Sequence, residues 1–135
     1  MRRILNVVIV LLMSAMIPVL AEACSTSTNP EIAALRAYAD PATQTTLQGL
    51  SEDNLAKYTQ YANNQFKAAV TQDVLDKTAT QVTNQLGSFV SITFLSTEKQ
   101  DVYTIVHYRA EYSKGEARVR MVFDLDHLVA GQWFE

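Results

Sequence analysis

The sequence has few of the residues that cross-link small proteins or bind metals: its 135 residues include one cysteine, one tryptophan and two histidines. A single cysteine cannot form an internal disulfide, so a hydrophobic core must hold the folded chain together. A zinc site needs three or four converging ligands, and too few histidines and cysteines are present to supply them. We therefore predict no disulfide framework and no metal centre, and we expect no cofactor.

An excess of basic residues is also missing. The chain has 11 lysines and arginines against 14 aspartates and glutamates, which gives a formal net charge of −3. Proteins that bind nucleic acid normally carry a basic stripe or patch, and none is visible here. The composition therefore argues against a nucleic-acid partner. With 48% hydrophobic residues, the chain is instead suited to one domain with one core.

Catalytic motifs are absent as well. His107 falls in the middle of an expected strand, and His127 falls in an expected turn. No nucleophile-elbow pattern supplies a serine to pair with either histidine. We expect His127 to be a solvated turn residue, and we predict no Ser-His-Asp arrangement.

The chain does have a long apolar start. Arg2 and Arg3 precede an almost continuously apolar run over residues 4–20, and Ala21-Glu22-Ala23 then gives a small-x-small site. This order of basic, apolar and small-residue regions is typical of a secretory signal peptide. We therefore expect residues 1–23 to be a signal peptide and the remainder of the chain to be exported.

The only cysteine, Cys24, lies directly between this leader and the polar stretch STSTN, residues 25–29. Cleavage before Cys24 and lipidation of its thiol would make the protein an extracytoplasmic, cell-envelope lipoprotein whose N-terminus binds the membrane. The site departs from the usual bacterial pattern, because Ala21 stands where leucine is common. The alternatives are cleavage after Ala23, which gives a secreted chain with a free thiol, and an uncleaved anchor. We favour the lipoprotein, with residues 24–29 as its tether.

Residues 30–135 are predicted to form one domain, and its first half has helical spacing of apolar residues. Asn29-Pro30 favours a helix start, because asparagine is a good N-cap and proline is tolerated in the first turn. Thr71 and Gly87 similarly favour the two ends of a later helix. The predicted helices are residues 30–49, interrupted at 40–41; residues 51–70, with a break at 63–64 left open; and residues 72–86.

After Gly87 the apolar spacing changes to the alternation typical of β-strands. The predicted strands are residues 88–96, 101–112, 116–125 and 128–135. A two-residue turn at Lys114-Gly115 would pair Glu111 with Arg118, which are opposite in charge. Helices followed by consecutive antiparallel strands define an α+β fold, in which the N-terminal helices pack on a four-stranded antiparallel curved sheet.

This register gives the sheet two unlike faces. One face is apolar and must be covered by the helices. The other is mixed, and we expect Arg109, Arg120 and Trp133 to form a row across three strands there. Adjacent arginines repel each other unless an anion relieves them, and tryptophan beside arginine allows a cation–π contact. This candidate surface patch is either an anion or partner-protein site, or a face neutralised by Glu111 and Asp124 or covered by a second copy of the chain.

Three landmarks carry a resemblance to an uncharacterised protein family. They are "ADP" at Ala39–Pro41, "GSF" beginning at Gly87, and "VFD…VAGQWF" between Val122 and Phe134. With their surrounding sequence they resemble the domain of unknown function 3887, in the nuclear-transport-factor-2-like superfamily. The resemblance implies export or lipid anchoring and a cone-shaped sheet, wrapped on helices around an apolar pocket. It also implies a possible homodimer through the sheet.

The pocket implied by the resemblance would be lined by inward-facing residues of the second and third strands, namely Tyr108, Tyr112, Met121 and Phe123. Some enzymes of the superfamily combine a carboxylate base with a tyrosine hydrogen-bond donor. No carboxylate shares the inward face of these strands, so a helix would have to supply it. The helices offer Asp40, Asp73 and Asp76.

We therefore expect an exported, non-catalytic domain that binds a small apolar ligand or peptide, or pairs with a second copy. The alternative is a small enzyme, such as an isomerase, a dehydratase or a hydrolase-associated protein, with its active site in the pocket. A carboxylate or histidine beside Tyr108 or Tyr112 is the feature that would favour the enzyme.

The leader generates a first prediction. Intact-mass analysis of protein taken from its own membranes should find a chain that begins at Cys24 and carries a lipid-sized mass increment. Cys24→Ala should abolish the increment and release the chain from the membrane fraction. A wild-type chain that begins elsewhere and has an unmodified mass would contradict the lipoprotein interpretation.

Overall fold

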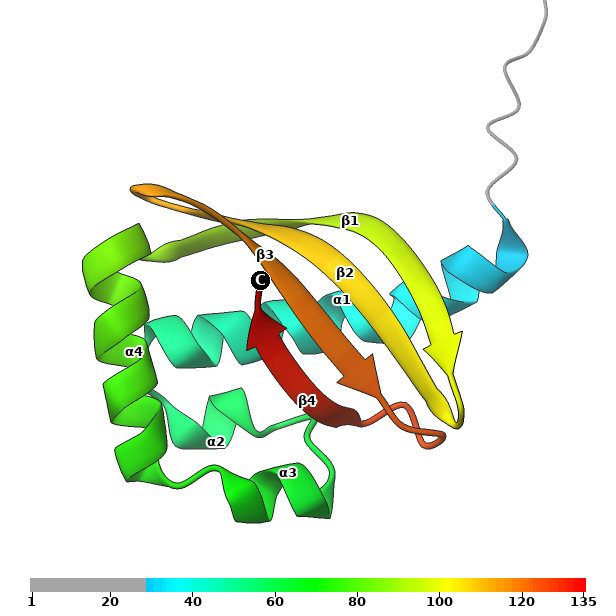
Figure 1. Ribbon diagram of the computed structural model, residues 1–135, viewed down its shortest axis with the longest axis horizontal. Coiled ribbons are helices and arrows are strands. Elements are labelled where there is room, and N and C mark those ends of the chain that lie inside the picture. Colours follow the sequence, from blue (N-terminus) through cyan, green and yellow to red (C-terminus); the bar gives the residue numbers. More distant parts are fainter. Residues whose placement is uncertain (1–28) are drawn as a thin grey trace, which may run out of the picture.

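Helices make up the first half of the described chain and strands the second half (Figure 1). The computed structural model describes residues 29–135, so the expected signal peptide, Cys24 and most of the tether lie outside the described residues. The helices are α1 (Pro30–Ser51), α2 (Leu55–Tyr58), α3 (Asn64–Ala69) and α4 (Gln72–Leu86). The strands are β1 (Phe89–Gln100), β2 (Tyr103–Tyr112), β3 (Gly115–Phe123) and β4 (Val129–Phe134).

The four strands form one antiparallel sheet in the order β1-β2-β3-β4. The sheet is curved, and α1 runs beneath its inner face, while α3 lies along the β4 side and α4 crosses one end (Figure 1). The predicted α+β class is therefore confirmed, with helices packed on a four-stranded antiparallel sheet. The inner face is apolar because alternate residues of each strand point the same way.

The core lies between α1 and the inner face of the sheet. Tyr108, Met121 and Phe123 have no exposed surface, and they belong to the same buried cluster as Ala39 and Leu47 of α1. Several α1 positions that face the core carry small side chains, which allow the helix to approach the strands closely. This burial is the dominant favourable term in folding the chain, since no disulfide can contribute.

The predicted interruption of the first helix at 40–41 is wrong. Helix α1 is continuous over 22 residues and contains Pro41 in its interior. Proline removes the hydrogen bond to the carbonyl four residues earlier, here that of Ala37. Both residues are exposed, so water can hydrogen-bond this carbonyl and the helix continues along its buried side.

The predicted helix over 51–70 is not continuous: the region forms two short helices, and the second begins at Asn64, at the break that the sequence left open. Each begins with its own asparagine cap: Asn54 Oδ1 accepts from the Lys57 amide at 3.0 Å, and Asn63 Oδ1 accepts from the Phe66 amide at 2.8 Å. Between the two helices the backbone bonds to the start of β4. The Asn63 amide donates to the Val129 carbonyl at 2.9 Å, and this long-range contact replaces a local helical bond.

The register of the β2–β3 hairpin differs from the predicted register. Each side chain nevertheless lies on its predicted face of the sheet. The turn residues are Ser113 and Lys114, so that Tyr112 pairs with Gly115. The Ser113 amide donates to the Ser88 carbonyl, and the Lys114 amide donates to the Leu86 carbonyl. These bonds hold the hairpin tip against the loop that follows α4. Every cross-strand partner is shifted by two residues, and an even shift leaves each side chain on its expected face.

Asp124 organises the turn between β3 and β4. Its Oδ1 accepts from the amides of Asp126 and Leu128 at 2.9 and 3.0 Å, and its Oδ2 accepts from Asn63 Nδ2 at 3.0 Å. Burial of the carboxyl opposes ionisation, but these hydrogen bonds outweigh burial and lower the pKa of Asp124. The carboxylate therefore ties the α2–α3 connection to the sheet.

This geometry predicts a pH dependence. Because the folded pKa is lowered, ionised Asp124 stabilises the fold above its unfolded pKa of about 4, and this stabilisation is lost as the pH falls through the folded value. Asp124→Asn keeps an oxygen acceptor but cannot ionise. We expect the variant to be about 1 kcal/mol less stable to urea at pH 7 and to lose less stability than wild type between pH 5 and pH 3. Asp126→Asn is the matched control, and parallel pH profiles for wild type and Asp124→Asn would contradict the role.

Candidate functional site

The four residues predicted to line an interior pocket are packed together in the core. Tyr108, Met121 and Phe123 are fully buried, and Tyr112 is 6% exposed. None of them lines any of the three clefts described below. At this place the curved sheet is therefore filled by its own side chains and by α1.

A carboxylate does lie beside Tyr108, as the enzyme alternative required. The Tyr108 hydroxyl donates to Asp40 Oδ1 at 2.8 Å, and Arg36 Nε donates to Asp40 Oδ2 at 2.9 Å. Burial, followed by the nearby Asp40 carboxylate, raises the pKa of Tyr108 far above its ordinary value. Tyr108 has no exposed surface. In this arrangement the pair links α1 to β2 and offers no atom of Tyr108 to a substrate.

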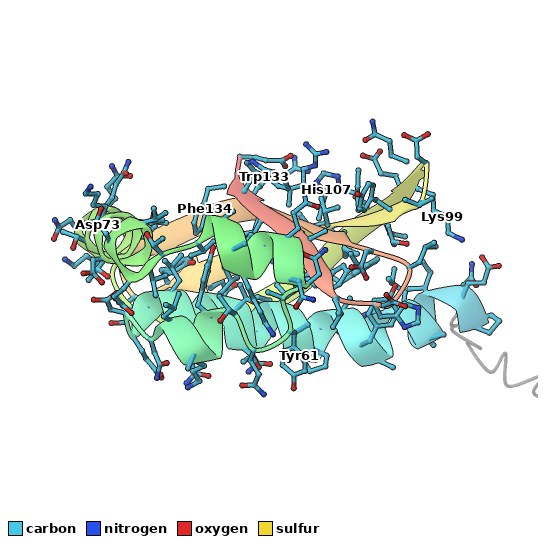
Figure 2. All side chains as sticks on the ribbon, turned by 90° about the horizontal axis from the view of Figure 1, so that it is seen from below. Tyr61, Asp73, Lys99, His107, Trp133 and Phe134 are labelled. Atoms are coloured by element: carbon cyan, nitrogen blue, oxygen red, sulfur yellow. The ribbon has the colours of Figure 1, made fainter. Side chains whose placement is uncertain are left out.

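The other two helix carboxylates lie elsewhere. Asp73 pairs with Lys77 across one turn of α4 at 2.8 Å, and Asp76 accepts a hydrogen bond from Gln72 on the same helix. Figure 2 shows Asp73 on the outer side of α4, at the end of the molecule. Asp40 is thus the only one of the three predicted candidates that contacts the predicted tyrosines.

A second polar group lies under β4. The Tyr58 hydroxyl donates to Gln132 Oε1 at 2.9 Å. Among the described residues, the buried Tyr112 hydroxyl and Gln132 Nε2 have no hydrogen-bond partner. Burial raises the pKa of both Tyr58 and Tyr112 to about 12. Both hydroxyls therefore stay protonated at physiological pH and can act as donors but not as bases.

The outer face of the sheet, turned away from α1, carries Trp133 and His107 (Figure 2). A cleft of about 610 Å³ lies on this face between α3 and strands β2 to β4. Its floor contains Ile105 and Val122, which are cross-strand partners and only 1% and 8% exposed although they lie outside the main core. Phe66 of α3 and Trp133 of β4 also line it. We call this site the outer-face cleft.

Arg120 supplies the positive charge in this cleft. It pairs with Trp133 across the sheet, as the sequence predicted, and its Cζ lies 5.4 Å from the centre of the Trp133 ring. Arg120 Nε is buried and without a hydrogen-bond partner among the described residues. Gly131 makes room for this arrangement, because a Cβ there would overlap the Trp133 ring. The structure therefore brings together two of the three residues of the predicted patch.

Arg109, the third residue of the predicted patch, lies apart from this cleft. It pairs with Arg118 rather than with Arg120, and its Nε is 3.8 Å from Glu116 Oε2. The expected three-residue row is wrong at this position because the hairpin register is shifted. Arg109 and Arg118 instead border a separate shallow cleft of about 590 Å³, together with Leu95.

His107 lies on the outer face opposite Arg120. Its Nε2 is 3.7 Å from Glu98 Oε1, and its Nδ1 is 3.4 Å from Glu135 Oε2. Within residues 29–135, no group of three or more histidine, cysteine, aspartate or glutamate side chains could hold a metal ion. His107 is therefore a polar neighbour of the outer-face cleft and has no metal-ligand partners in the described chain.

Sequence reasoning missed a further cleft at the end of the molecule where α1 begins. It has a volume of about 500 Å³, and Leu35, Val102 and Leu125 line part of it. His127, expected only as a solvated turn residue, is exposed but stacks on Tyr38 with ring centres 3.9 Å apart. The two residues come from opposite ends of the domain, so no local sequence signal could have paired them.

Among the residues with described positions, no helix is both long and apolar enough to cross a membrane. The fold and the clefts define the protein as an α+β domain with a filled interior and ligand-sized depressions on its surface. Its family follows from comparison with known sequences. Residues 44–131 match the family described as protein of unknown function (DUF3887), and the chain belongs to that family. No curated protein and no solved structure matches the chain.

The link between Tyr108 and Asp40 generates a stability prediction. Tyr108→Phe removes a hydrogen bond to a charged group, so we expect a loss of about 1.5–3 kcal/mol of unfolding free energy in urea. Tyr112→Phe is the matched control, because its buried hydroxyl has no partner among residues 29–135 and its removal should be nearly neutral. A double-mutant cycle of Tyr108→Phe with Asp40→Asn should show coupling, and additive effects would contradict the link.

Proposed function

We propose that the protein is an exported, lipid-anchored, non-catalytic binding domain that holds its ligand in the outer-face cleft. The ligand is a small molecule or a peptide segment with an apolar part. We also assign the fold to the nuclear-transport-factor-2-like superfamily, on the basis of its curved sheet wrapped on helices. In this protein the interior of the cone would serve stability, and its outer face would serve binding.

The order of features at the N-terminus supports the anchor. A basic start, an apolar run and a small-residue site precede the lone Cys24, and the polar residues 25–29 follow it. The first helical residue is Pro30. At no more than about 3.5 Å per residue, the intervening chain would keep the start of α1 within about 20 Å of a lipidated Cys24. The domain would therefore act close to the membrane surface.

The exposed apolar lining of the outer-face cleft is the observation that carries the binding function. Ile105 and Val122 close the floor of the cleft with almost no exposed surface, and the apolar surface open to a ligand belongs to Tyr103 and Trp133, which are 39% and 52% exposed. The cleft volume of about 610 Å³ is typical of small-molecule sites, which are mostly apolar with a few well-placed polar groups. Arg120 is such a polar group.

The hydrogen bond between Tyr108 and Asp40 favours the second candidate, a small enzyme. A protonated tyrosine beside a carboxylate could act on a carbonyl substrate. Catalysis would, however, require the core to open, because Tyr108 is fully buried. The binding domain needs no such rearrangement, and we prefer it for this reason.

The outer face also supports a possible partner, a second copy of the chain. The like-charged pairs Arg109–Arg118 and Glu111–Glu116 are adjacent across β2 and β3. A two-fold axis through this face could set each arginine pair against the glutamate pair of the other copy. Such a dimer would compete with the ligand for the outer-face cleft.

The single tryptophan allows a direct test, because all tryptophan emission comes from Trp133 in the cleft. We would titrate residues 24–135 bearing Cys24→Ser, a chain that includes every described helix and strand, with the neutral probe N-phenyl-1-naphthylamine. Energy transfer from Trp133 to bound probe should quench the protein emission in a saturable manner. Ala69→Phe, which fills the α3 side of the cleft, should weaken probe binding at least tenfold.

Ala68→Phe is the matched control, because Ala68 is also exposed on α3 but does not line the cleft. Binding equal to wild type is expected for this variant. Absence of saturable quenching in the wild type, or equal binding by Ala69→Phe, would overturn the proposed function. A mass in solution that doubles with concentration, with loss of probe binding, would favour the homodimer instead.

A further inference from the structure

We propose that the outer-face cleft selects amphipathic monocarboxylates. The carboxylate of the ligand pairs with the guanidinium of Arg120, and its apolar body lies between the rings of Phe66 and Trp133, which line the cleft. This inference rests on the proposed function and names the ligand class for the same cleft. It follows from three properties of the cleft: an arginine without a counterion in the described part of the chain, a separation of charges along the cleft, and a fixed aromatic wall.

Arg120 lacks an anionic partner. None of the ion pairs within residues 29–135 includes it. The two carboxylates that reach this part of the outer face, Glu98 and Glu135, contact His107 instead. Arg120 Nε is shielded from solvent and bonds to no described residue, and Trp133 lies against the guanidinium. Incomplete hydration strengthens the attraction of this cation for an anion, because the local dielectric constant is low.

An arginine is suited to a carboxylate in particular. Its planar guanidinium matches the two oxygens of a carboxylate, and these charge-assisted hydrogen bonds are about twice as strong as neutral ones. A ligand carboxylate would therefore give Arg120 the counterion that residues 29–135 do not provide.

The single carboxylate that lines the cleft is too distant to neutralise Arg120. Asp101 lies in the turn before β2, whereas Arg120 pairs with His107, six residues further along. At about 3.3 Å per strand residue, roughly 20 Å separate the two positions. Ile105 lies between them on the same face. The cleft is thus cationic at one end and apolar along its middle, which matches a head-and-tail molecule.

The apolar wall is held in place before any ligand arrives. The absence of a side chain at Gly131 lets the Trp133 ring lie across the strand, where half of its surface remains exposed. On the opposite side, Phe66 is braced by Tyr58, with ring centres 5.8 Å apart. An apolar body between these rings would cover the exposed face of Trp133 without the cost of ordering a mobile side chain.

The test compares decanoate with decan-1-ol, which has the same tail and no charge, using Trp133 emission of the 24–135 chain bearing Cys24→Ser. Wild type should bind decanoate at least tenfold more tightly than decan-1-ol. Arg120→Met should weaken decanoate binding by about 10- to 100-fold and leave decan-1-ol unchanged, as expected for loss of a hydrogen-bonded ion pair. Arg118→Met is the matched control: it removes the same charge from the same strand outside the cleft, and decanoate binding should stay within about threefold of wild type.

Each outcome decides between the claims. Equal binding of decanoate and decan-1-ol by wild type would overturn the carboxylate inference and leave the proposed function intact; this comparison needs no variant to fold. Equal losses for Arg118→Met and Arg120→Met would also overturn it, because they would indicate a general electrostatic effect. No response of Trp133 to decanoate, decan-1-ol or the naphthylamine probe would overturn the proposed function itself. A response to phosphatidylglycerol vesicles without a response to monomeric decanoate would assign the cleft to a lipid surface and not to a free carboxylate.

Discussion

The contact between α1 and the inner face of the sheet is the constraint on which the rest of the structure depends. Without a disulfide or a described metal site, the fold relies on removing the apolar side chains of β2 and β3 from water. The small residues of α1, such as Ala39 and Ala42, let the helix lie close against the curved strands. This requirement is strong enough to keep α1 continuous through Pro41, because the proline and the carbonyl it leaves free both lie on the solvent side.

Because side chains fill the interior of the curved sheet, a ligand is more easily bound on its other face. The polar groups that remain inside, such as the Tyr108 hydroxyl bonded to Asp40, join one element to another, and Tyr108 itself has no exposed surface. The outer face, by contrast, combines a buried apolar floor with an arginine that has no counterion in the described chain. Burying part of a charged group without a partner destabilises a fold, and such groups are common at functional sites. This is the physical reason to expect a ligand beside Arg120.

A carboxylate beside a tyrosine does not by itself indicate an active site. On the sequence alone, a carboxylate or histidine beside Tyr108 or Tyr112 is the feature that favours an enzyme, and Asp40 is one of three helix candidates for it. In the structure the two groups do meet, but at a depth where their hydrogen bond holds a helix to a strand. Composition and distance alone would assign the pair to catalysis, whereas the complete burial of Tyr108 assigns it to stability.

The sequence by itself determined the α+β class, the number and direction of the strands, and the division of the sheet into an apolar and a mixed face. These features depend on local periodicity and on alternation, which survive a small error in register. It also predicted the Arg120–Trp133 neighbours, since both lie near a short turn. The sequence left open a break at 63–64 in the helix over 51–70. Only the tertiary structure decided that Arg109 pairs with Arg118, that Asn63 bonds to Val129 at this break, and that Tyr38 stacks on His127. Each of these outcomes depends on a contact between residues far apart in the chain, such as the hairpin tip with the loop after α4, and no local pattern encodes such a contact.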